Sequence, residues 1–480
     1  MRETPGAAGR SSDWVARDTA VVWHGFTQMA SFAENSPVIV DHAEGRELVD
    51  VEGNRYLDAI SSLWVTTLGH RVPELDAAVR RQLDRVAHST LLGHGNTTAV
   101  ELAEALAKVV PVDDPHVLFA SDGASSVEQA LKIALQYWAN RGVAGRTRYL
   151  ALGNAYHGDT VGSLSVGDGG FGTDLFDPLR FPVLRTPGYD DPGWADKAVA
   201  AVGSNAGELA AVVVEPLVQG AAGMLVSDPG ALSTLAEACR RAGVLLIADE
   251  VATGFGRTGR LFASQWSGIR PDLLCLGKGL TGGYLPMSAT VASGEVHAAF
   301  LGEDLGPRTF YHGHSFAGNA LAAAVALEHL RLLEEWDVLA NVRARADQLA
   351  TLLARRVVGL SPVAEVRQRG LMVGVELRPP RPGLRWGRRV CAGAVSRGVL
   401  LRPLGDVVVV MPPLTTTAEE VERIVAALAD SIAEVAGVDG GVAGVDGVDG
   451  VGGGVAGVDG GGGVAGVDGD AGVGGGVGAS

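Results

Sequence analysis

The stretch PDLLCLGKGLTGG (residues 271–283) places one lysine directly after an apolar run and before a cluster of glycines. An apolar run bounded by a proline and a glycine is typical of a short buried strand. Lys278 would then lie at the mouth of that strand, where desolvation of its ammonium group is costly. A lysine in this place either extends its side chain to water or has a chemical reason to stay.

Other short apolar and β-branched runs occur on the N-terminal side of this stretch, and helical patterns separate them. The five predicted strands are 116–121, 148–153, 210–216, 244–250 and 272–278. Residues 125–141 and 229–243 have the 3.6-residue period of amphipathic helices. Strands that alternate with helices predict an α/β fold with a mostly parallel central sheet.

Three of the predicted strands end at a charged residue. These residues are Glu215, Asp249 and Lys278. Ligands of open α/β sheets bind outside the carboxyl ends of the strands. We therefore expect the carboxylates and the lysine to lie at one crevice.

A lysine and a carboxylate at one crevice suit pyridoxal 5'-phosphate. Lys278 can hold its aldehyde as an imine, with an amine pKa lowered by desolvation, and Asp249 can keep its ring nitrogen protonated. Gly123 and Ala124 lead into a predicted helix, whose first N–H groups would bind the phosphate. Taken alone, each residue is more simply explained by structure: Lys278 as a lysine that reaches water, Asp249 as a cap or turn residue and Gly123 as a turn glycine.

The segment NAYHGDT adds an aromatic pair, Tyr156 and His157, suited to stacking on the pyridine ring, although His157 alone reads as structural. We also count Glu215 and Val251 among the residues that contact the cofactor. A competing motif, GFGRTG at 254–259, has the glycine spacing of a dinucleotide site. It does not open a clear helix, so we reject a nicotinamide site.

Composition excludes several other classes of function. A formal net charge of −16 argues against binding of a nucleic acid backbone. No stretch is long and apolar enough to span a bilayer, and the first residues have no secretory pattern, so we expect a cytoplasmic protein without membrane contact. The three cysteines are far apart; we expect them in the core, and we predict no metal site.

The chain changes composition once, near Gly437. From there the unit GVAGVDG recurs without aromatic or basic residues, which predicts a disordered tail over 437–480. For the remainder we expect a large cofactor-binding domain over 61–335. A smaller α+β domain would be built from 1–60 and 336–436.

Three blocks of sequence together resemble the class III aminotransferases. They are LLIADEVATGFGRTG (245–259), PDLLCLGKGLTGGYLP (271–286) and YHGHSFAGNALA (311–322). The resemblance implies fold type I of the pyridoxal phosphate enzymes, with Lys278 attached to the cofactor, Asp249 at its ring nitrogen and Tyr156 over the ring. It also implies a homodimer in which Gly313, His314 and Ser315 approach the partner subunit's cofactor.

Four further segments resemble the branch of this family that converts 8-amino-7-oxononanoate to 7,8-diaminononanoate in biotin biosynthesis. They are 136–138, 155–167, 214–224 and 401–414. The resemblance implies that Arg402 binds the carboxylate of the oxononanoate, a role that suits a bidentate guanidinium.

The amino donor divides this branch into an S-adenosylmethionine-using group and a lysine-using group. Phe26, Leu63 and Val409 stand where the first group has tyrosine or tryptophan, whereas HSTLLG (88–93) and RPLGDV (402–407) resemble the second. With Trp64 framing the donor channel, we favour L-lysine. The alternatives are an ω-amino-acid aminotransferase of the same family and an inactive paralogue that serves only in binding.

Overall fold

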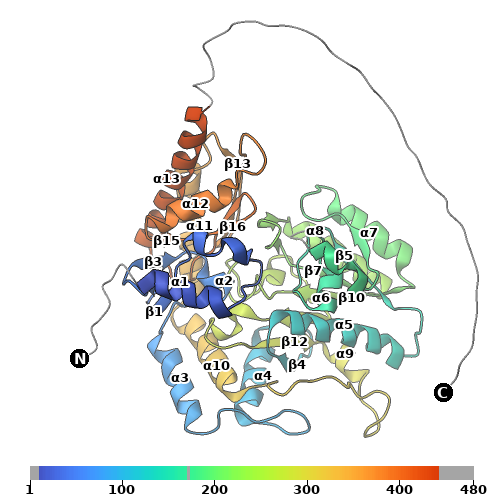
Figure 1. The fold of residues 1–480 in the computed structure, drawn as a ribbon. Coiled ribbons are helices and arrows are strands. Elements are labelled where there is room, and N and C mark those ends of the chain that lie inside the picture. The colour runs from blue at the N-terminus through green and yellow to red at the C-terminus, as the bar shows by residue number, and fades with distance from the viewer. Residues whose placement is uncertain (1–9, 170–172, 443–480) are drawn as a thin grey trace, which may run out of the picture. The chain divides into compact units, whose positions relative to one another are not determined.

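A computed structural model describes residues 10–169 and 173–442. The described chain up to Gly437 belongs to one compact unit (Figure 1). Its main feature is a seven-stranded sheet with the order β4-β12-β11-β10-β7-β5-β6. The strands are β4 (His116–Ala120), β5 (Arg148–Leu152), β6 (Leu184–Thr186), β7 (Leu209–Val214), β10 (Leu245–Asp249), β11 (Leu273–Leu276) and β12 (Ser288–Ala292).

The five strands expected from the sequence are all present, and the neighbours from β11 to β6 pair in parallel. Strand β12, which we did not predict, runs antiparallel to both β11 and β4. Connections between parallel strands need long crossovers, which here include α7 (Trp194–Asn205) and α8 (Pro229–Ala242). The described fold is α/β with a large, mostly parallel central sheet, as expected from the sequence.

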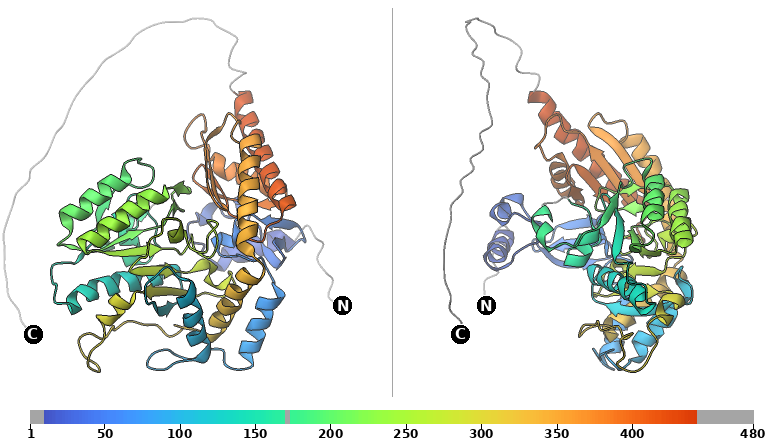
Figure 2. Two further views of the ribbon diagram at one scale, coloured as in Figure 1. Left: turned by 180° about the vertical axis from the view of Figure 1, so that it is seen from behind. Right: turned by 90° about the vertical axis from the view of Figure 1, so that its right-hand side faces the viewer.

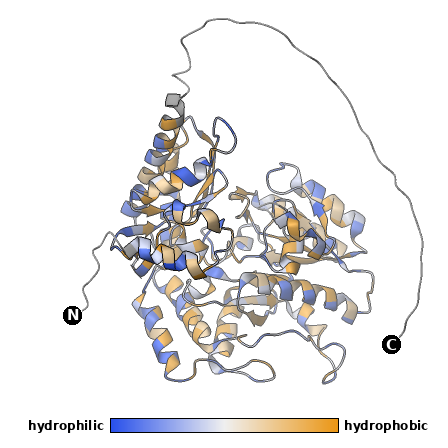
Figure 3. Ribbon diagram, in the orientation of Figure 1, coloured by the Kyte–Doolittle hydropathy of each residue, from blue (hydrophilic) through white to orange (hydrophobic). Residues whose placement is uncertain are grey.

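The central strand β7 shows why this sheet is stable. All of its residues are buried, because helices cover both faces of the sheet. Val212 and Val214 belong to an apolar cluster with residues of α7 and α8, whereas Ala211 and Val213 pack in a cluster with α5 (Gly123–Asn140). Figure 3 shows the helices with both hydrophilic and hydrophobic stretches, as expected for elements with one buried face.

Two further four-stranded sheets are formed by the two ends of the folded chain (Figures 1 and 2). The first has the order β1-β2-β3-β15 and the second the order β13-β14-β17-β16. Their strands are β1 (Val40–Glu44), β2 (Glu47–Asp50), β3 (Arg55–Asp58), β15 (Val399–Leu400), β13 (Val363–Arg369), β14 (Met372–Leu377), β17 (Val407–Val410) and β16 (Arg402–Leu404). A short hairpin pairs β8 (Val218–Gln219) with β9 (Leu225–Val226).

The remaining helices lie around these sheets. They are α1 (Arg10–Val21), α2 (Ser61–Trp64), α3 (Pro73–Leu83), α4 (Thr97–Val109), α6 (Val161–Val166), α9 (Gly294–Ala298), α10 (Ala320–Glu335), α11 (Val338–Arg356), α12 (Trp386–Val395) and α13 (Ala418–Val442). Short 3₁₀ turns are η2 (Met29–Ser31), η3 (Ala33–Asn35), η4 (Thr173–Leu179), η5 (Ala263–Trp266) and η6 (Lys278–Thr281). No helix of the described residues is both long and apolar enough to cross a bilayer.

Helix α13 extends past the predicted start of the tail at residue 437, to Val442. The rest of the predicted tail, 443–480, lies outside the described residues. Both terminal segments of the folded chain contribute to small sheets, but the division into 1–60, 61–335 and 336–436 stays a prediction. The three cysteines are buried and free, as expected for core residues.

The hairpin turn at Gly370, between β13 and β14, offers a test of this packing. Gly370 has φ +60°, and a Cβ atom there would overlap the carbonyl oxygen of Arg257. Gly45, between β1 and β2, has the same φ but no atom within 4 Å of a Cβ position. We expect Gly45→Ala to cost about 1 kcal/mol of unfolding free energy, from backbone strain alone.

Gly370→Ala should cost roughly 1 to 3 kcal/mol more than this, because the backbone at Arg257 has to move. Denaturant unfolding of both variants measures the difference. Equal losses would show that the contact at Arg257 adds nothing to the strain of the turn.

Candidate active site

Three charged side chains meet at the carboxyl ends of β7, β10 and β11. Glu215 follows β7, Asp249 ends β10 and Lys278 comes two residues after β11. All three line one cavity of about 460 Å³. These three side chains therefore lie at one crevice, as the topology of a parallel sheet predicts.

Lys278 lies in this cavity with its Nζ 5.0 Å from the centre of the Trp64 ring. Burial lowers the pKa of Lys278, and the charge of Arg257 adds to this, while Asp249 and Glu215 oppose it. The structure thus favours the neutral amine, the form that attacks a carbonyl carbon. The backbone at Lys278 is left-handed, with φ +38°.

Asp249 is held by two contacts of its carboxylate. Oδ2 lies 2.7 Å from Nδ1 of His157, and Oδ1 accepts a hydrogen bond from the N–H of Val251 at 3.0 Å. Burial alone would lower the pKa of His157, but the hydrogen bond and charge of Asp249, together with Glu215, raise it. The sequence suggested that His157 stacks with Tyr156 on the pyridine ring or is structural, and its observed contact is with Asp249.

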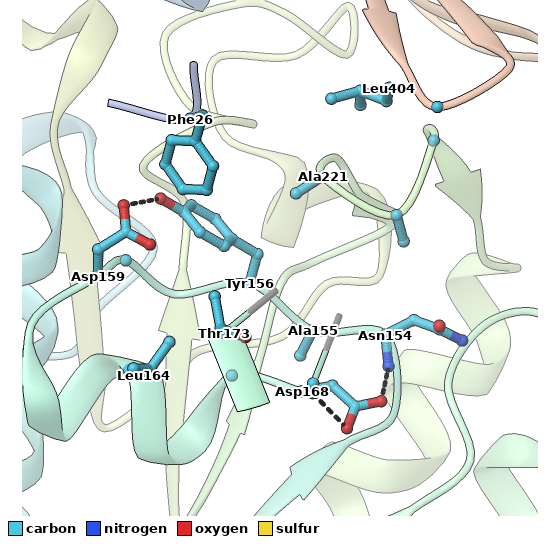
Figure 4. A pocket seen from close by; sticks show the side chains of 16 residues that line it. Phe26, Asn154, Ala155, Tyr156, Asp159, Leu164, Asp168, Thr173, Ala221 and Leu404 are labelled. Atoms are coloured by element: carbon cyan, nitrogen blue, oxygen red, sulfur yellow. Dashed lines mark hydrogen bonds between the residues drawn. The ribbon is translucent and has the colours of Figure 1, made fainter. Parts of the chain in front are cut away.

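Glu215 fixes the loop that carries Tyr156. Its Oε1 accepts from the N–H of Tyr156 at 3.0 Å, and its Oε2 accepts from the N–H of Gly220 at 3.1 Å. Burial raises the pKa of Glu215 to about 7. The hydroxyl of Tyr156 donates to Asp159 at 2.9 Å, which turns the ring along the cavity wall (Figure 4).

The opposite side of the cavity is the N-terminus of α5. Asp122 caps this helix by accepting from the N–H of Ser125 at 2.9 Å. A Cβ atom at Gly123 would meet Cγ1 of Val251 at 2.6 Å, so the helix start and β10 approach closely only because this residue is glycine. Gly123, Ala124 and Val251 all line the cavity, and the first N–H groups of α5 suit an anion.

A second cavity of about 370 Å³ adjoins the first, because Tyr156, Gly158 and Asp159 line both. Phe26, from the segment after α1, lies beside Tyr156 on its wall (Figure 4). Leu404 lies on the other side of this cavity. Of the residues predicted to bind substrate, Phe26, Trp64 and Tyr156 therefore line one or both cavities.

Other predicted residues line neither cavity. Leu63 is 44% exposed. Arg402 lies on β16 opposite Val409, and the two-residue period of a strand puts it on the face of Leu404. The segment of Gly313, His314 and Ser315 lies next to 88–92 instead, where the carbonyl of Ser315 is 2.7 Å from Nε2 of His88.

Two features escaped the sequence analysis. Arg257, inside the rejected GFGRTG motif, is fully buried and donates to the carbonyl oxygens of Thr66 and Pro412 at 2.9 and 2.6 Å. This motif forms turns rather than the start of a helix, which agrees with its rejection as a dinucleotide site. The residues next to Arg257 in the sequence do not indicate its role, because the carbonyl oxygens that accept its hydrogen bonds lie far away in sequence.

The second missed feature is the backbone of α2. Ser61, Ser62, Leu63 and Trp64 all have positive φ, at 51°, 57°, 127° and 68°. Each left-handed residue other than glycine costs roughly 1 to 2 kcal/mol. Sequence patterns do not indicate such a turn, since serine, leucine and tryptophan normally avoid it.

The observed site fits pyridoxal phosphate. Buried nitrogens that lack a hydrogen-bond partner among the described residues remain at Trp64 Nε1 and His157 Nε2, and both side chains line the larger cavity. A buried lysine with a lowered pKa, a fixed carboxylate and a helix N-terminus are the three groups that the aldehyde, ring nitrogen and phosphate require. The residues present can therefore hold this cofactor.

Comparisons with known proteins agree with this chemistry. Residues 29–432 match the family described as aminotransferase class III. A relative from Nitratidesulfovibrio vulgaris, named adenosylmethionine-8-amino-7-oxononanoate aminotransferase, is 48% identical over 91% of this chain and 85% of its own length. A relative of the same name from Geobacter sulfurreducens is 42% identical over 88% of this chain and 98% of its own length.

Solved structures show the same relationship. The aminotransferase of that name from Methanocaldococcus jannaschii superimposes with a TM-score of 0.85 at 37% identity, covering 88% of this chain and 99% of its own. A PLP-bound amine transaminase from an uncultivated Pseudomonas species has a TM-score of 0.81 at 33% identity, covering 86% and 99%. The chain therefore belongs to the class III aminotransferases, which use pyridoxal phosphate.

Proposed function

We propose that this enzyme transfers an amino group to 8-amino-7-oxononanoate and forms 7,8-diaminononanoate for biotin synthesis. The observation that carries the proposal is the cavity at the ends of β7, β10 and β11, with Lys278, Asp249 and Glu215 in its lining. The names of relatives at 36–48% identity over most of the chain support the choice of acceptor.

We assign the cofactor contacts as follows. Lys278 holds the aldehyde, Asp249 faces the ring nitrogen and Tyr156 lies over the ring. The N–H groups of Gly123 and Ala124 bind the phosphate at the start of α5. His157 orients Asp249 by its 2.7 Å contact, and Glu215 fixes the Tyr156 loop.

Pyridoxal phosphate, when bound, withdraws electrons from the carbon that carries the amino group. Lys278 Nζ would act as the base that accepts the proton from that carbon and then gives it up, because burial lowers the pKa of this amine. Asp249 would hold the ring nitrogen, and the same groups would act in reverse on the acceptor.

We also propose a homodimer. The segments 83–92 and 301–316 lie side by side, since His88 and Phe316 have ring centres 5.1 Å apart. Both segments expose large apolar side chains, which are Leu83, Val86, Leu92, Leu301, Leu305, Tyr311 and Phe316. Apolar side chains gathered in this way favour association with another chain. In such a dimer, Gly313, His314 and Ser315 would lie at the partner subunit's cavity. The cytoplasmic location stays a prediction.

For the donor we favour L-lysine over S-adenosylmethionine. Two carboxylates, Asp159 and Asp168, are among the described residues that line the smaller cavity, and neither lysine nor arginine is among them. This lining suits the far ammonium group of lysine. Val409, where the adenosylmethionine group has a tyrosine, is completely buried in an apolar cluster and offers no polar contact.

The likeness to an amine transaminase keeps an ω-amino-acid aminotransferase as the second candidate. An inactive binding paralogue is disfavoured, because the cavity retains Lys278 and Asp249 in contact with supporting residues. Transfer of an amino group to 8-amino-7-oxononanoate, compared with transfer to pyruvate, distinguishes the first two candidates. Faster transfer to pyruvate than to 8-amino-7-oxononanoate would show that the proposed acceptor is wrong.

Lys278→Ala tests the attachment of the cofactor. We expect the variant to bind pyridoxal phosphate through Asp249 and the start of α5, but to lose turnover by several orders of magnitude. Borohydride should fix the cofactor to the Lys278 peptide of the parent and to no peptide of the variant, as peptide masses would show. Turnover near the parental rate would remove Lys278 from the mechanism.

Arg402→Ala tests recognition of the acceptor. Loss of a charge-assisted contact should weaken oxononanoate binding by about 2 to 3 kcal/mol, on the order of a hundredfold in KM, without loss of bound cofactor. Arg423→Ala is the matched control, because Arg423 pairs with Glu47 at the surface of the chain. An unchanged KM in Arg402→Ala would show that another group binds the carboxylate.

The donor is tested by the first half of the reaction alone. Enzyme loaded with pyridoxal phosphate should convert to the pyridoxamine form with lysine at least tenfold faster than with S-adenosylmethionine, since Leu63 and Val409 offer no aromatic face to a purine or a sulfonium. Asp168→Asn should reduce the rate with lysine and spare the rate with a neutral amine. A faster first half-reaction with S-adenosylmethionine than with lysine would place the enzyme in the group that uses S-adenosylmethionine.

A further inference from the structure

The left-handed turn Ser61–Trp64 needs an external support. A run of left-handed residues without glycine is unstable for L-amino acids, which visit this region as single residues. The bonds from the N–H groups of Trp64 and Val65 to the carbonyls of Ile60 and Ser61, at 2.9 and 3.0 Å, lie within the turn itself. The conformation therefore depends on contacts from outside the turn.

Asp58, the last residue of β3, supplies such contacts. Its side chain is completely buried, and Oδ1 accepts from the N–H of Ser62 at 2.9 Å while Oδ2 accepts from the hydroxyl of Ser62 at 2.8 Å. His70 Nε2 lies 2.9 Å from the same Oδ2 and holds the carboxylate in place. Asp58 thus grips the backbone and the side chain of one residue inside the turn.

The end of the turn determines where Trp64 lies. The indole is only 6% exposed, with Lys278 Nζ 5.0 Å from the ring centre. Gly220 packs against the ring edge, where a Cβ atom would lie 3.2 Å from Cζ3. A right-handed backbone at Ser62 and Leu63 would send the chain in another direction, and Trp64 would leave this slot.

We propose that Asp58 is a positioning residue for the reaction. It holds Ser61–Trp64 in the left-handed turn, and this turn holds the Trp64 indole against Lys278. The inference rests on the proposed cofactor site. Asp58 lines neither cavity, so we assign its effect on the reaction to the turn that carries Trp64.

The first experiment compares glycine with alanine at Ser62 in the parent chain. Both substitutions remove the hydroxyl contact to Asp58, but only glycine adopts φ 57° without strain. We expect the Tm of Ser62→Gly to exceed that of Ser62→Ala by about 1 to 3 °C. Ser204, exposed on α7, is the matched control, and there glycine should be less stable than alanine.

The second experiment adds Asp58→Asn, which keeps the size of the side chain but removes one acceptor. We expect kcat/KM for the amine half-reaction to fall by about tenfold or more, with a changed visible circular dichroism of the bound cofactor. Adding Ser62→Gly should restore most of both signals, and adding Ser62→Ala should restore neither. In a Trp64→Ala background, Asp58→Asn should lower kcat/KM less than twofold while still lowering the Tm.

Three results would overturn the proposal. One is a Tm of Ser62→Gly below that of Ser62→Ala, a measurement that needs no folded Asp58 variant. Another is equal recovery by glycine and alanine in the Asp58→Asn chain. The third is an undiminished loss of kcat/KM in the Trp64→Ala background. The Tm and dichroism need no oxononanoate, so failure of the proposed acceptor leaves them interpretable.

Discussion

The burial of an amine between two carboxylates is the constraint on which this active site depends. Parallel pairing of β7, β10 and β11 brings Glu215, Asp249 and Lys278 to one edge of a sheet whose strands are buried. Burial lowers the pKa of Lys278 and raises that of Glu215 to about 7, so both groups are pushed toward their neutral forms. The desolvation that lowers the pKa of Lys278 makes this amine reactive, and it also adds a free-energy cost to folding.

The supporting contacts keep these groups from collapsing into a simple ion pair. Asp249 is occupied by His157 and by the N–H of Val251, while Glu215 accepts from the backbone of Tyr156 and Gly220. Each carboxylate is thereby committed to a structural partner, and the amine of Lys278 stays available. Buried polar groups of this kind are stable only when their acceptors are satisfied. The loops that carry Tyr156 and Gly220 are in turn fixed by their hydrogen bonds to the two oxygens of Glu215.

Sequence reasoning recovered what is local along the chain. The strands β7, β10 and β11 have clear apolar periods, and the charged residues that end them follow directly, so Asp249 and Lys278 could be placed together before any coordinates. Arg257 and Asp58 could not. Arg257 donates to backbone carbonyls far away in sequence, and Asp58 accepts from Ser62 in a turn whose left-handed dihedral angles no residue pattern indicates. His157 was found but given another contact, since aromatic type does not tell which ring atom meets which neighbour. Strand β12 was missed because its alternation of small residues resembles a loop.

Packing as well as chemistry explains the stretch that carries Lys278, residues 271–283. Two of its glycines allow close packing: Gly277 gives room for Val251, whose Cγ1 would lie 3.2 Å from a Cβ there, and Gly283 lies against the backbone of Thr66. The first contact brings β11 close to the start of α5, and the second joins the lysine loop to the chain that follows Trp64. Lys278 itself has a left-handed backbone between these two contacts. The lysine therefore stays at the mouth of a buried strand because packing on both sides directs it into the cavity, where its chemistry is used.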